Sequence, residues 1–417
     1  MMFLLLCLFI GASVGVLTPR RYDNDKVFRI LPKTEKEVEF IKYLDNKMQL
    51  DFFKPASSHQ VIPNNPADFH TSAEESEIIM KFLEKKGIKF DILSENLQET
   101  IERQFQVVEE KNNRSGRIFR YQPWEKIATW AFSVALRNPK LVSMMEIGKT
   151  YEGRPIILLK VGKQKACKKG IILECGIHAR EWISPAFCQW FVNEAVKTYG
   201  KDKNMTRLLD RVTFHVIPVF NIDGYVWSWT QDRLWRKNRK PNGECIGTDL
   251  NRNFNISWNK FEKDEDPCMQ AYAGTGPESE VETQAFSTYI RKNLDSIKAH
   301  ISFHSYGQML LYPYGHAEEN IPNHEIVEKL AVSALEALSG LFGTKYIHGS
   351  ISKIIGLVSG SSIDWSYEEG IKYSFGFELR DGKIYNFLLP ESLIKPTCQE
   401  TMLAVKVIAN HVLKLET

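Results

Sequence analysis

The sequence predicts an α/β fold, in which a mixed, largely parallel central sheet is flanked by helices and preceded by a small α+β domain. Short apolar or β-branched runs recur through residues 115–417, and longer amphipathic segments lie between them, as alternating strands and helices require. With 417 residues, of which 43% are hydrophobic and 25% charged, the chain is long enough for more than one folding unit.

The chain begins with an apolar run that is too short to span a bilayer and that ends in the small residues Ser13 and Gly15. We interpret residues 1–15 as a cleaved signal peptide, and the sequence does not fix the exact position of cleavage. No later stretch approaches the ~20 apolar residues of a membrane helix, so we expect no membrane span. Asn-x-Ser/Thr sites that agree with secretion occur at Asn113, Asn204 and Asn255.

Secretion would permit disulfide bonds. Outside the signal peptide the chain has six cysteines, which composition alone cannot pair: Cys167, Cys175, Cys188, Cys245, Cys268 and Cys398.

Residues 16–114 form a leader with a net charge of −2, whereas residues 115–417 carry +5. This charge is too small and too scattered to indicate nucleic acid as a partner. An acidic leader on a basic body would fit a pro-segment docked onto the larger part, although ordinary scatter explains the difference equally well. The polar stretch 109–117 contains Lys111, Arg114 and Arg117, and it is predicted to be an exposed activation linker.

Hydrophobic patterning predicts the elements of each part. In the leader these are a strand at Lys26–Ile30, helices at Glu35–Leu44 and Ser72–Lys86, and a strand at Lys89–Leu93. In the larger part the predicted strands are Ile156–Val161, Gly170–Leu173, Val212–Val219, His300–Phe303 and Ser374–Phe377.

Two helices of the larger part have predicted starts. One begins at Ser184, as an N-cap followed by Pro185, and runs to Gly200. The last helix begins at Thr397, with Glu400 completing a capping box.

Unusual polar residues follow several of these strands. They are His178 and Glu181 after Gly170–Leu173, His304 after His300–Phe303, and Glu378 after Ser374–Phe377. In open α/β sheets, ligands bind outside the carboxyl ends of the strands. We therefore expect these side chains to converge on one crevice.

A metal site is predicted by His178 and Glu181, whose spacing can direct both side chains toward one ion. His304 would be the third ligand, and two nitrogens with one carboxylate leave a fourth position for water, as in catalytic zinc sites. A lone His-x-x-Glu is more often a surface helix pair, but Ile177 and Trp182 beside this one disfavour a solvated face.

Other polar residues each have two open interpretations. Asp249 either orients a ligand histidine through the second ring nitrogen or caps a loop. Glu378 lies among apolar strand residues, where a carboxylate is costly to bury unless it is functional or paired with Arg380 or Lys372. Two arginines are, taken singly, more often structural than catalytic: Arg236 and Arg252.

Together these residues resemble the M14 A/B-type zinc metallocarboxypeptidases of pancreas and mast cells. The motifs, in the family's order, are His178-Ala-Arg-Glu-Trp, Arg233-Leu-Trp-Arg-Lys, Asp249-Leu-Asn-Arg-Asn, His304-Ser-Tyr and Phe377-Glu-Leu-Arg-Asp. The match covers essentially all of residues 115–417, and the leader is similar to the family's propeptide in length and layout. The resemblance implies a peptide hydrolase made as a zymogen, with residues 16–114 as an inhibitory propeptide and residues 115–417 as the catalytic domain.

The resemblance also implies roles for individual residues. One Zn²⁺ per chain would be bound by His178, Glu181 and His304. Glu378 would be the general base for the attacking water, and Arg236 would bind substrate and stabilise the oxyanion.

Substrate recognition follows from the same resemblance. Asn251 and Arg252 would hold the terminal carboxylate, which makes the enzyme an exopeptidase. Neighbouring subsites would be lined by Arg180, Tyr306 and Phe387. The implied disulfides are Cys175–Cys188 and Cys245–Cys268, without an obvious partner for Cys167 or Cys398. The implied substrates are peptide C-termini, and the implied activator is a trypsin-like protease. The enzyme would be a secreted, extracellular monomer that is either free or stored in granules.

The floor of the specificity pocket is expected at Ile363. Family members that cleave arginine and lysine have an aspartate there, so isoleucine predicts a preference for aromatic and large aliphatic C-terminal residues. Asp364 is expected to point away from the pocket on an extended backbone. Gly356 stands where the family has a mobile tyrosine that caps the terminal carboxylate. The alternative is therefore a weakly active zinc-binding relative that binds peptide C-termini, although Glu378 favours the enzyme.

Overall fold

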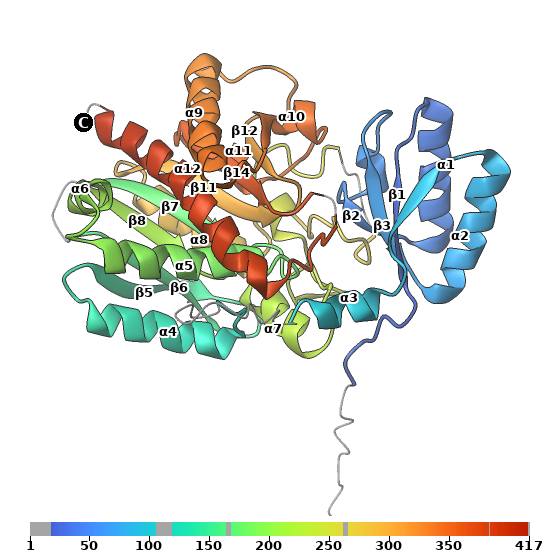
Figure 1. The fold of residues 1–417 in the computed structure, drawn as a ribbon, viewed down its shortest axis with the longest axis horizontal. Coiled ribbons are helices and arrows are strands. Elements are labelled where there is room, and N and C mark those ends of the chain that lie inside the picture. The colour runs from blue at the N-terminus through green and yellow to red at the C-terminus, as the bar shows by residue number, and fades with distance from the viewer. Residues whose placement is uncertain (1–17, 106–118, 164–167, 262–265, 383, 416–417) are drawn as a thin grey trace, which may run out of the picture.

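The computed structural model describes residues 18–105, 119–163, 168–261, 266–382 and 384–415. A small N-terminal domain lies against one end of a larger domain (Figure 1). The predicted signal peptide 1–15 and the basic residues of the predicted activation linker, Lys111, Arg114 and Arg117, fall outside the described residues. Within the described ranges, no helix is long and apolar enough to cross a membrane.

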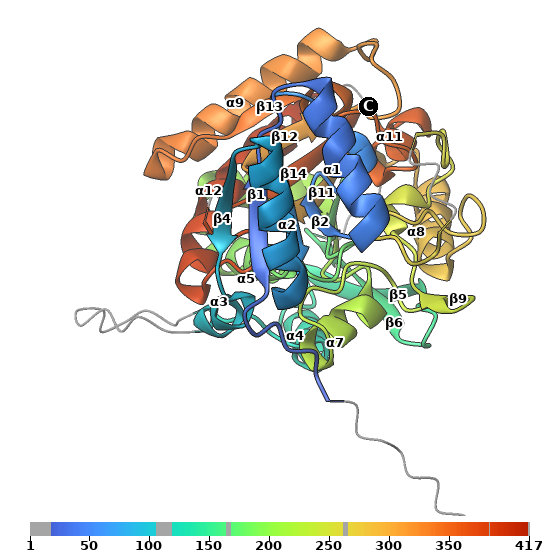
Figure 2. The same ribbon diagram turned by 90° about the vertical axis from the view of Figure 1, so that its right-hand side faces the viewer.

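The N-terminal domain is a four-stranded antiparallel sheet of order β2-β3-β1-β4, with two long helices on one face (Figure 2). Its elements are β1 (Lys26–Ile30), α1 (Glu35–Met48), β2 (Asp51–Lys54), a 3₁₀ turn (Ser58–Gln60), β3 (Ala67–Thr71), α2 (Ala73–Lys86), β4 (Phe90–Ser94) and α3 (Leu97–Arg103). The predicted α+β leader is confirmed.

Alternation along β1 gives this domain two buried faces. Phe28 packs in the domain's own core with side chains of α1 and α2, whereas Val27 points to the other face and packs against the larger domain. The helices begin where the sequence supplies caps: α1 follows the N-cap Thr34, and α2 follows Ser72, which forms a capping box with Glu75.

The sequence pattern does not predict β2, β3 or α3. β3 is fully buried although it carries polar residues at alternate positions. Asp68 accepts two hydrogen bonds of 2.6 Å from Arg29, and His70 lies 2.8 Å from Asp25. In the sequence, these alternating polar residues resemble the solvent-facing side of a strand. They are buried because residues from other segments pair with them.

The larger domain is built on an eight-stranded mixed sheet of order β13-β12-β14-β11-β7-β8-β6-β5. Strands β14, β11, β7 and β8 are parallel, whereas β12 on β14, β6 on β8 and β5 on β6 are antiparallel. The strands are β5 (Val142–Lys149), β6 (Pro155–Val161), β7 (Lys169–Cys175), β8 (Val212–Ile217), β11 (Ile297–Ser305), β12 (Met309–Tyr312), β13 (Ile347–Ser350) and β14 (Tyr373–Leu379). A separate ribbon joins β9 (Pro241–Asn242) to β10 (Cys245–Ile246).

Helices cover both faces of this sheet. Along β11, Phe303 packs on Phe187 of α5 with ring centroids 4.5 Å apart, whereas His300 points to the opposite face and bonds Ser366 of α11. The helices are α4 (Trp124–Arg137), α5 (Ile183–Thr198), α6 (Lys203–Arg211), α7 (Ile222–Thr230), α8 (Val281–Lys292), α9 (His324–Phe342), α10 (Ile351–Ile354), α11 (Ser362–Glu368) and α12 (Ile394–Lys414). The predicted fold class is confirmed.

The predicted start of α5 is wrong. The helix begins at Ile183, so Ser184 lies inside it rather than capping it. The Ser184 hydroxyl accepts a hydrogen bond from the backbone N–H of Gly176 at 2.9 Å and donates to the carbonyl of Phe303 at 2.6 Å. Its partners are thus the ends of two strands and not the helix N-terminus.

The predicted capping box of α12 is also wrong. This helix begins at Ile394, and Thr397 donates its hydroxyl to the carbonyl of Leu393. Glu400 is buried and accepts a hydrogen bond of 2.7 Å from Arg380. A buried ion pair therefore explains the glutamate.

Both implied disulfides are present, Cys175–Cys188 and Cys245–Cys268. The first joins the end of β7 to α5, on either side of the segment that contains His178 and Glu181. Cys398 is buried in α12 and has no disulfide partner among the described residues, and Cys167 lies outside them.

Replacing Ser184 with alanine should lower the free energy of unfolding by about 1–3 kcal/mol, because the backbone groups of Gly176 and Phe303 lose a buried partner. Urea unfolding measures the change. Thr129→Ala removes an exposed hydroxyl bonded to the carbonyl of Glu125 and is the matched control, expected within about 0.5 kcal/mol of the parent. A Ser184→Ala change as small as that of the control would contradict the bridging role.

Candidate metal centre and active site

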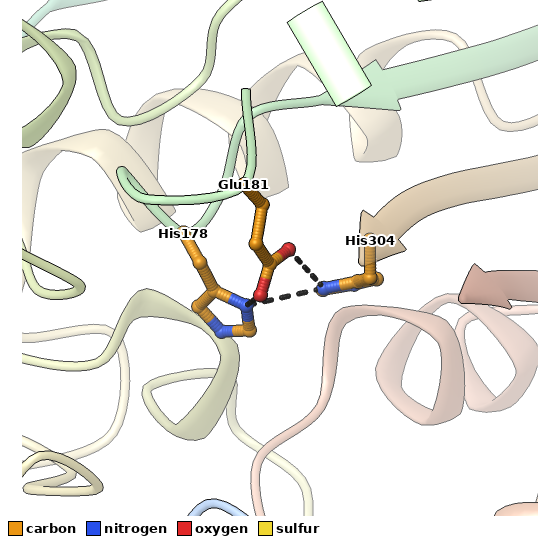
Figure 3. Close-up of side chains that lie close together, drawn as sticks. All are labelled: His178, Glu181 and His304. Carbon is orange, nitrogen blue, oxygen red and sulfur yellow. Dashed lines mark hydrogen bonds and ion pairs between the residues drawn. The ribbon is translucent and has the colours of Figure 1, made fainter. Parts of the chain in front are cut away.

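Three side chains meet at the carboxyl ends of β7 and β11 (Figure 3). Nδ1 of His178 is 2.7 Å from Oε1 of Glu181. Nδ1 of His304 is 3.2 Å from Nδ1 of His178 and 3.2 Å from Oε2 of Glu181. The three ligand atoms lie within 4.8 Å of one another, so two imidazole nitrogens and one carboxylate face a single point.

Hydrogen bonds behind the triad orient both rings. Nε2 of His178 is 3.2 Å from Oδ1 of Asp249, and Nε2 of His304 is 2.9 Å from the hydroxyl of Ser302. In both rings, the second nitrogen is thus engaged and Nδ1 is turned inward. This arrangement is typical of metal-binding histidines.

Asp249 makes the contacts expected from both interpretations, the orientation of a ligand histidine and the capping of a loop. Its side chain caps the 3₁₀ turn Leu250–Arg252 by accepting from the backbone N–H of Asn251, and it also faces His178. Arg236 donates to its Oδ2 from Nε and from a terminal nitrogen, at 3.0 and 2.7 Å. Burial alone would raise the pKa of Asp249, but Arg236 and His178 hold it well below its usual range, so the carboxylate stays charged.

These donors fit Zn²⁺, which is bound by histidine nitrogens and carboxylate oxygens. Among the described residues one other group has metal-ligand side chains, Cys245, Asp266 and Cys268. Its two cysteines are joined in a disulfide and have no thiolate to offer.

Glu378 lies beside the triad because β11 and β14 pair in parallel register, with His304 opposite Glu378. Together with the triad, it lines a cavity of about 310 Å³. Burial raises the pKa of Glu378 to about 8. The structural partners considered for it are engaged elsewhere, Arg380 with Glu400 and Lys372 with the carbonyl of Tyr367.

Another part of the cavity wall is apolar. Asn251 and Arg252 line the cavity beside this wall, which consists of Met309, Leu311, Ile351, Val358 and Ile363. Among the described residues that line the cavity, Glu181 and Glu378 are the acidic ones, and both lie at the triad. Among the described residues that line the cavity, no carboxylate comes from the part of the wall around Ile363 and Val358.

Asp364 does face away from the pocket, but the expected extended backbone is wrong. Residues 362–368 form α11, and the Asp364 carboxylate accepts hydrogen bonds from the backbone of Gly315 and His316 at 2.8 and 2.9 Å. Gly356 has a left-handed φ of +112°, and a Cβ there would meet only the carbonyl of Gln60, at 3.9 Å. Tyr306 is the one tyrosine among the described residues that line the cavity.

The N-terminal domain covers this cavity and forms part of its wall. Its lining residues are Phe53, Lys54, Pro55, Ala56, Gln60, Val61, Asn65 and Pro66. The Lys54 ammonium and Cβ of Glu378 lie 3.0 and 3.6 Å from the point where a Cβ on Gly307 would stand. Burial lowers the pKa of Lys54, and the nearby Glu378 opposes that shift. Sequence reasoning missed Lys54, because only the docking of the two domains brings it to the site.

The three residues assigned to neighbouring subsites all contact the N-terminal domain. Arg180 donates to Asp51 and to the carbonyl of Phe52, both at 3.0 Å; Tyr306 donates to Asp68 at 2.8 Å; and the ring of Phe387 lies 5.0 Å from that of Phe53. The domain thus occupies the groups that line the approach to the cavity.

A buried triad of metal ligands and a nearby carboxylate indicate a metal-dependent hydrolase whose site is covered by its own N-terminal domain. Residues 127–404 match the family model described as zinc carboxypeptidase, and residues 28–104 match the carboxypeptidase activation peptide. Mast cell carboxypeptidase A of Homo sapiens is 50% identical over 405 residues, 97% of each chain. Carboxypeptidase B of Rattus norvegicus is 45% identical over 412 residues, 98% of this chain and 99% of that one.

The solved structures agree. A crystal structure of thrombin activatable fibrinolysis inhibitor superposes with a TM-score of 0.87 and 38% identity, covering 95% of this chain and all of that one. The chain belongs to the zinc carboxypeptidase family. It is a metallocarboxypeptidase made with an activation peptide, and its substrates are peptide C-termini. The alternative of a weakly active binding relative has no support in these comparisons.

His304→Ala should remove one zinc ion per chain together with all measurable activity, because a single imidazole and one carboxylate remain to bind the metal. Metal analysis after dialysis measures the loss. His324→Ala, on α9 and away from the cavity, is the control and should keep its zinc. Full zinc retention in His304→Ala would refute the ligand assignment.

Proposed function

We propose that this chain is the secreted zymogen of an exopeptidase that removes single aromatic or large aliphatic residues from peptide C-termini. The observation that carries the proposal is the apolar wall around Ile363, next to Asn251 and Arg252 and without an acidic side chain. The proposed segments are a signal peptide at 1–15, a propeptide at 16–114 and a catalytic domain at 115–417, which acts as a monomer. The matched ranges 28–104 and 127–404 support this division.

In the proposed mechanism, zinc bound by His178, Glu181 and His304 would act as a Lewis acid toward water and the peptide carbonyl. Glu378 takes a proton from the attacking water and later gives it to the leaving amine. Arg236, held by Asp249, is proposed to donate to the oxyanion that forms on the way to the transition state.

Asn251 and Arg252 are proposed to hold the terminal carboxylate. The planar guanidinium offers two parallel donors to a carboxylate, and the asparagine amide adds another. Both residues line the cavity that also holds the triad and Glu378. A substrate without a free C-terminus therefore lacks the group that these residues bind.

The preference for apolar side chains follows from the cost of burial. An unpaired ammonium or guanidinium loses several kcal/mol when it is buried, whereas an apolar side chain gains about 1.5–3 kcal/mol. Ile363 and Val358 have no group that pairs with a cation. Gly356 supplies no cap for the carboxylate, so we expect a higher KM without loss of bond cleavage.

Inhibition before activation is proposed to come from the docked N-terminal domain. Asp51 and Asp68 pair with Arg180 and Tyr306, and Lys54 lies beside Glu378. A peptide would have to displace all three contacts. A trypsin-like cut near Arg114 or Arg117 would free the domain to leave.

Glu378→Gln keeps the shape of the side chain but removes the base. In the trimmed enzyme we expect kcat to fall by about 10²–10⁴-fold, while zinc content and KM stay within about twofold. Steady-state kinetics with a peptide ending in phenylalanine, together with metal analysis, measure both. Near-normal turnover would reduce Glu378 to a structural residue.

Matched peptides ending in phenylalanine and arginine test the pocket. We expect kcat/KM to favour phenylalanine by at least about a hundredfold, and Ile363→Asp to shift the ratio toward arginine by a similar factor. Preference of the parent enzyme for arginine would show that the pocket assignment is wrong.

The full-length chain should gain at least about a hundredfold in kcat/KM after trypsin treatment, because the covered cavity then opens to peptides. Activity before and after trimming measures the gain. The control is a variant with Lys111, Arg114 and Arg117 all replaced by glutamine, which should stay uncut in the linker and inactive. Equal activity of the parent chain before and after trimming would contradict inhibition.

A further inference from the structure

Glu174 is a fully buried carboxylate that the proposed mechanism does not use. It lies in β7, four residues before His178, and its side chain shares a sheet face with that of Ser302 on β11. Its Oε2 accepts a hydrogen bond of 3.1 Å from the hydroxyl of Ser362 and lies 3.4 Å from Nε2 of His300. Oε1 has no hydrogen-bond partner among the described residues.

Ser362 connects this buried carboxylate to the substrate-binding groups. It is the first residue of α11, directly before Ile363, and both residues line the cavity. The backbone N–H of Ser362 donates to Oδ1 of Asn251 at 2.9 Å. Because its amide oxygen is engaged, Asn251 keeps its amide nitrogen, a donor, for a carboxylate in the cavity.

The start of α11 and the loop of Asn251 are also fitted tightly against each other. A Cβ on Gly360 would come within 2.1 Å of the Arg252 carbonyl oxygen, and Phe254 donates its backbone N–H to the carbonyl of Gly360. Any shift of Ser362 is therefore transmitted to Asn251 and Arg252. His300 adds a second hold on the helix, because its Nδ1 lies 2.9 Å from the hydroxyl of Ser366.

A buried carboxylate beside a buried imidazole is a poor source of stability, since desolvation offsets most of the attraction between the groups. Apolar residues of similar volume would fill the space between β7, β11 and α11 at no greater cost. What Glu174 and His300 provide instead is a fixed position for α11. Each lies on a central strand of the sheet and forms a hydrogen bond with one hydroxyl of that helix.

We propose that Glu174 is a positioning residue for substrate binding: backed by His300, it fixes the first turn of α11 through Ser362, so that Asn251 and Ile363 meet the C-terminal residue of the peptide in register. This inference rests on the proposed function and adds to it a residue that never touches the substrate. It acts on binding of the C-terminal residue and leaves the metal ligands and Glu378 in place.

The test compares Glu174→Leu, which has no acceptor for the Ser362 hydroxyl, with Ser362→Ala and the double variant, each expressed as the full chain, loaded with zinc and trimmed. Both single variants should raise KM for a peptide ending in phenylalanine by about tenfold, with kcat and zinc content within about twofold of the parent. The inhibition constant of free phenylalanine should rise by the same factor, because it has the same carboxylate. The double variant should be no worse than either single one, since both remove the same connection.

Ser287→Ala is the matched control, because this buried hydroxyl of α8 has no hydrogen-bond partner among the described residues. It should leave KM unchanged. Ser362→Ala keeps the Glu174–His300 pair and decides the question if Glu174→Leu does not fold. Unchanged KM in Ser362→Ala, or additive losses in the double variant, would overturn the inference. Turnover by the trimmed parent reports on the proposed function separately.

Discussion

Parallel pairing of β7, β11 and β14 is the constraint on which the rest of the molecule depends. Because these strands run in one direction, their carboxyl ends share one edge of the sheet, and the ladder sets His304 opposite Glu378 and Ser302 opposite Glu174. A slip of one residue would turn every one of these side chains to the other face. The registers of these two pairings, β11 with β14 and β11 with β7, thus fix the metal ligand, the proposed base and the proposed positioning carboxylate.

The N-terminal domain binds to the same residues of the cleft that are proposed to contact the substrate. Arg180 and Tyr306 bind its carboxylates, Phe387 packs on its aromatic ring, and a cation lies beside Glu378. Complementary charges fix the orientation of docking more than they add affinity. The apolar contacts of Val27 and Phe53 with the larger domain supply the desolvated area that holds the two parts together.

How much the sequence could predict depended on whether a feature is local. Strands with long apolar runs and the motif residues His178, Glu181, His304 and Glu378 could be found because pattern and spacing are carried by neighbouring residues. The buried polar strand β3 and the role of Lys54 could not, because their partners come from distant segments. Ser184 and Thr397 resemble N-caps, yet tertiary bonds and an earlier helix start override that local preference.

The backbone conformation at Gly356 affects how a capping tyrosine could be engineered into this protein. At φ +112° the chain adopts a conformation that side chains with a Cβ rarely take, at a cost of about 1–3 kcal/mol. Space is not the obstacle, since the nearest atom to a Cβ would be 3.9 Å away. A tyrosine introduced here by a point substitution would therefore have to adopt this unfavourable backbone conformation. Grafting a cap onto this scaffold requires exchanging the whole segment between α10 and α11, so that the backbone and the side chain change together.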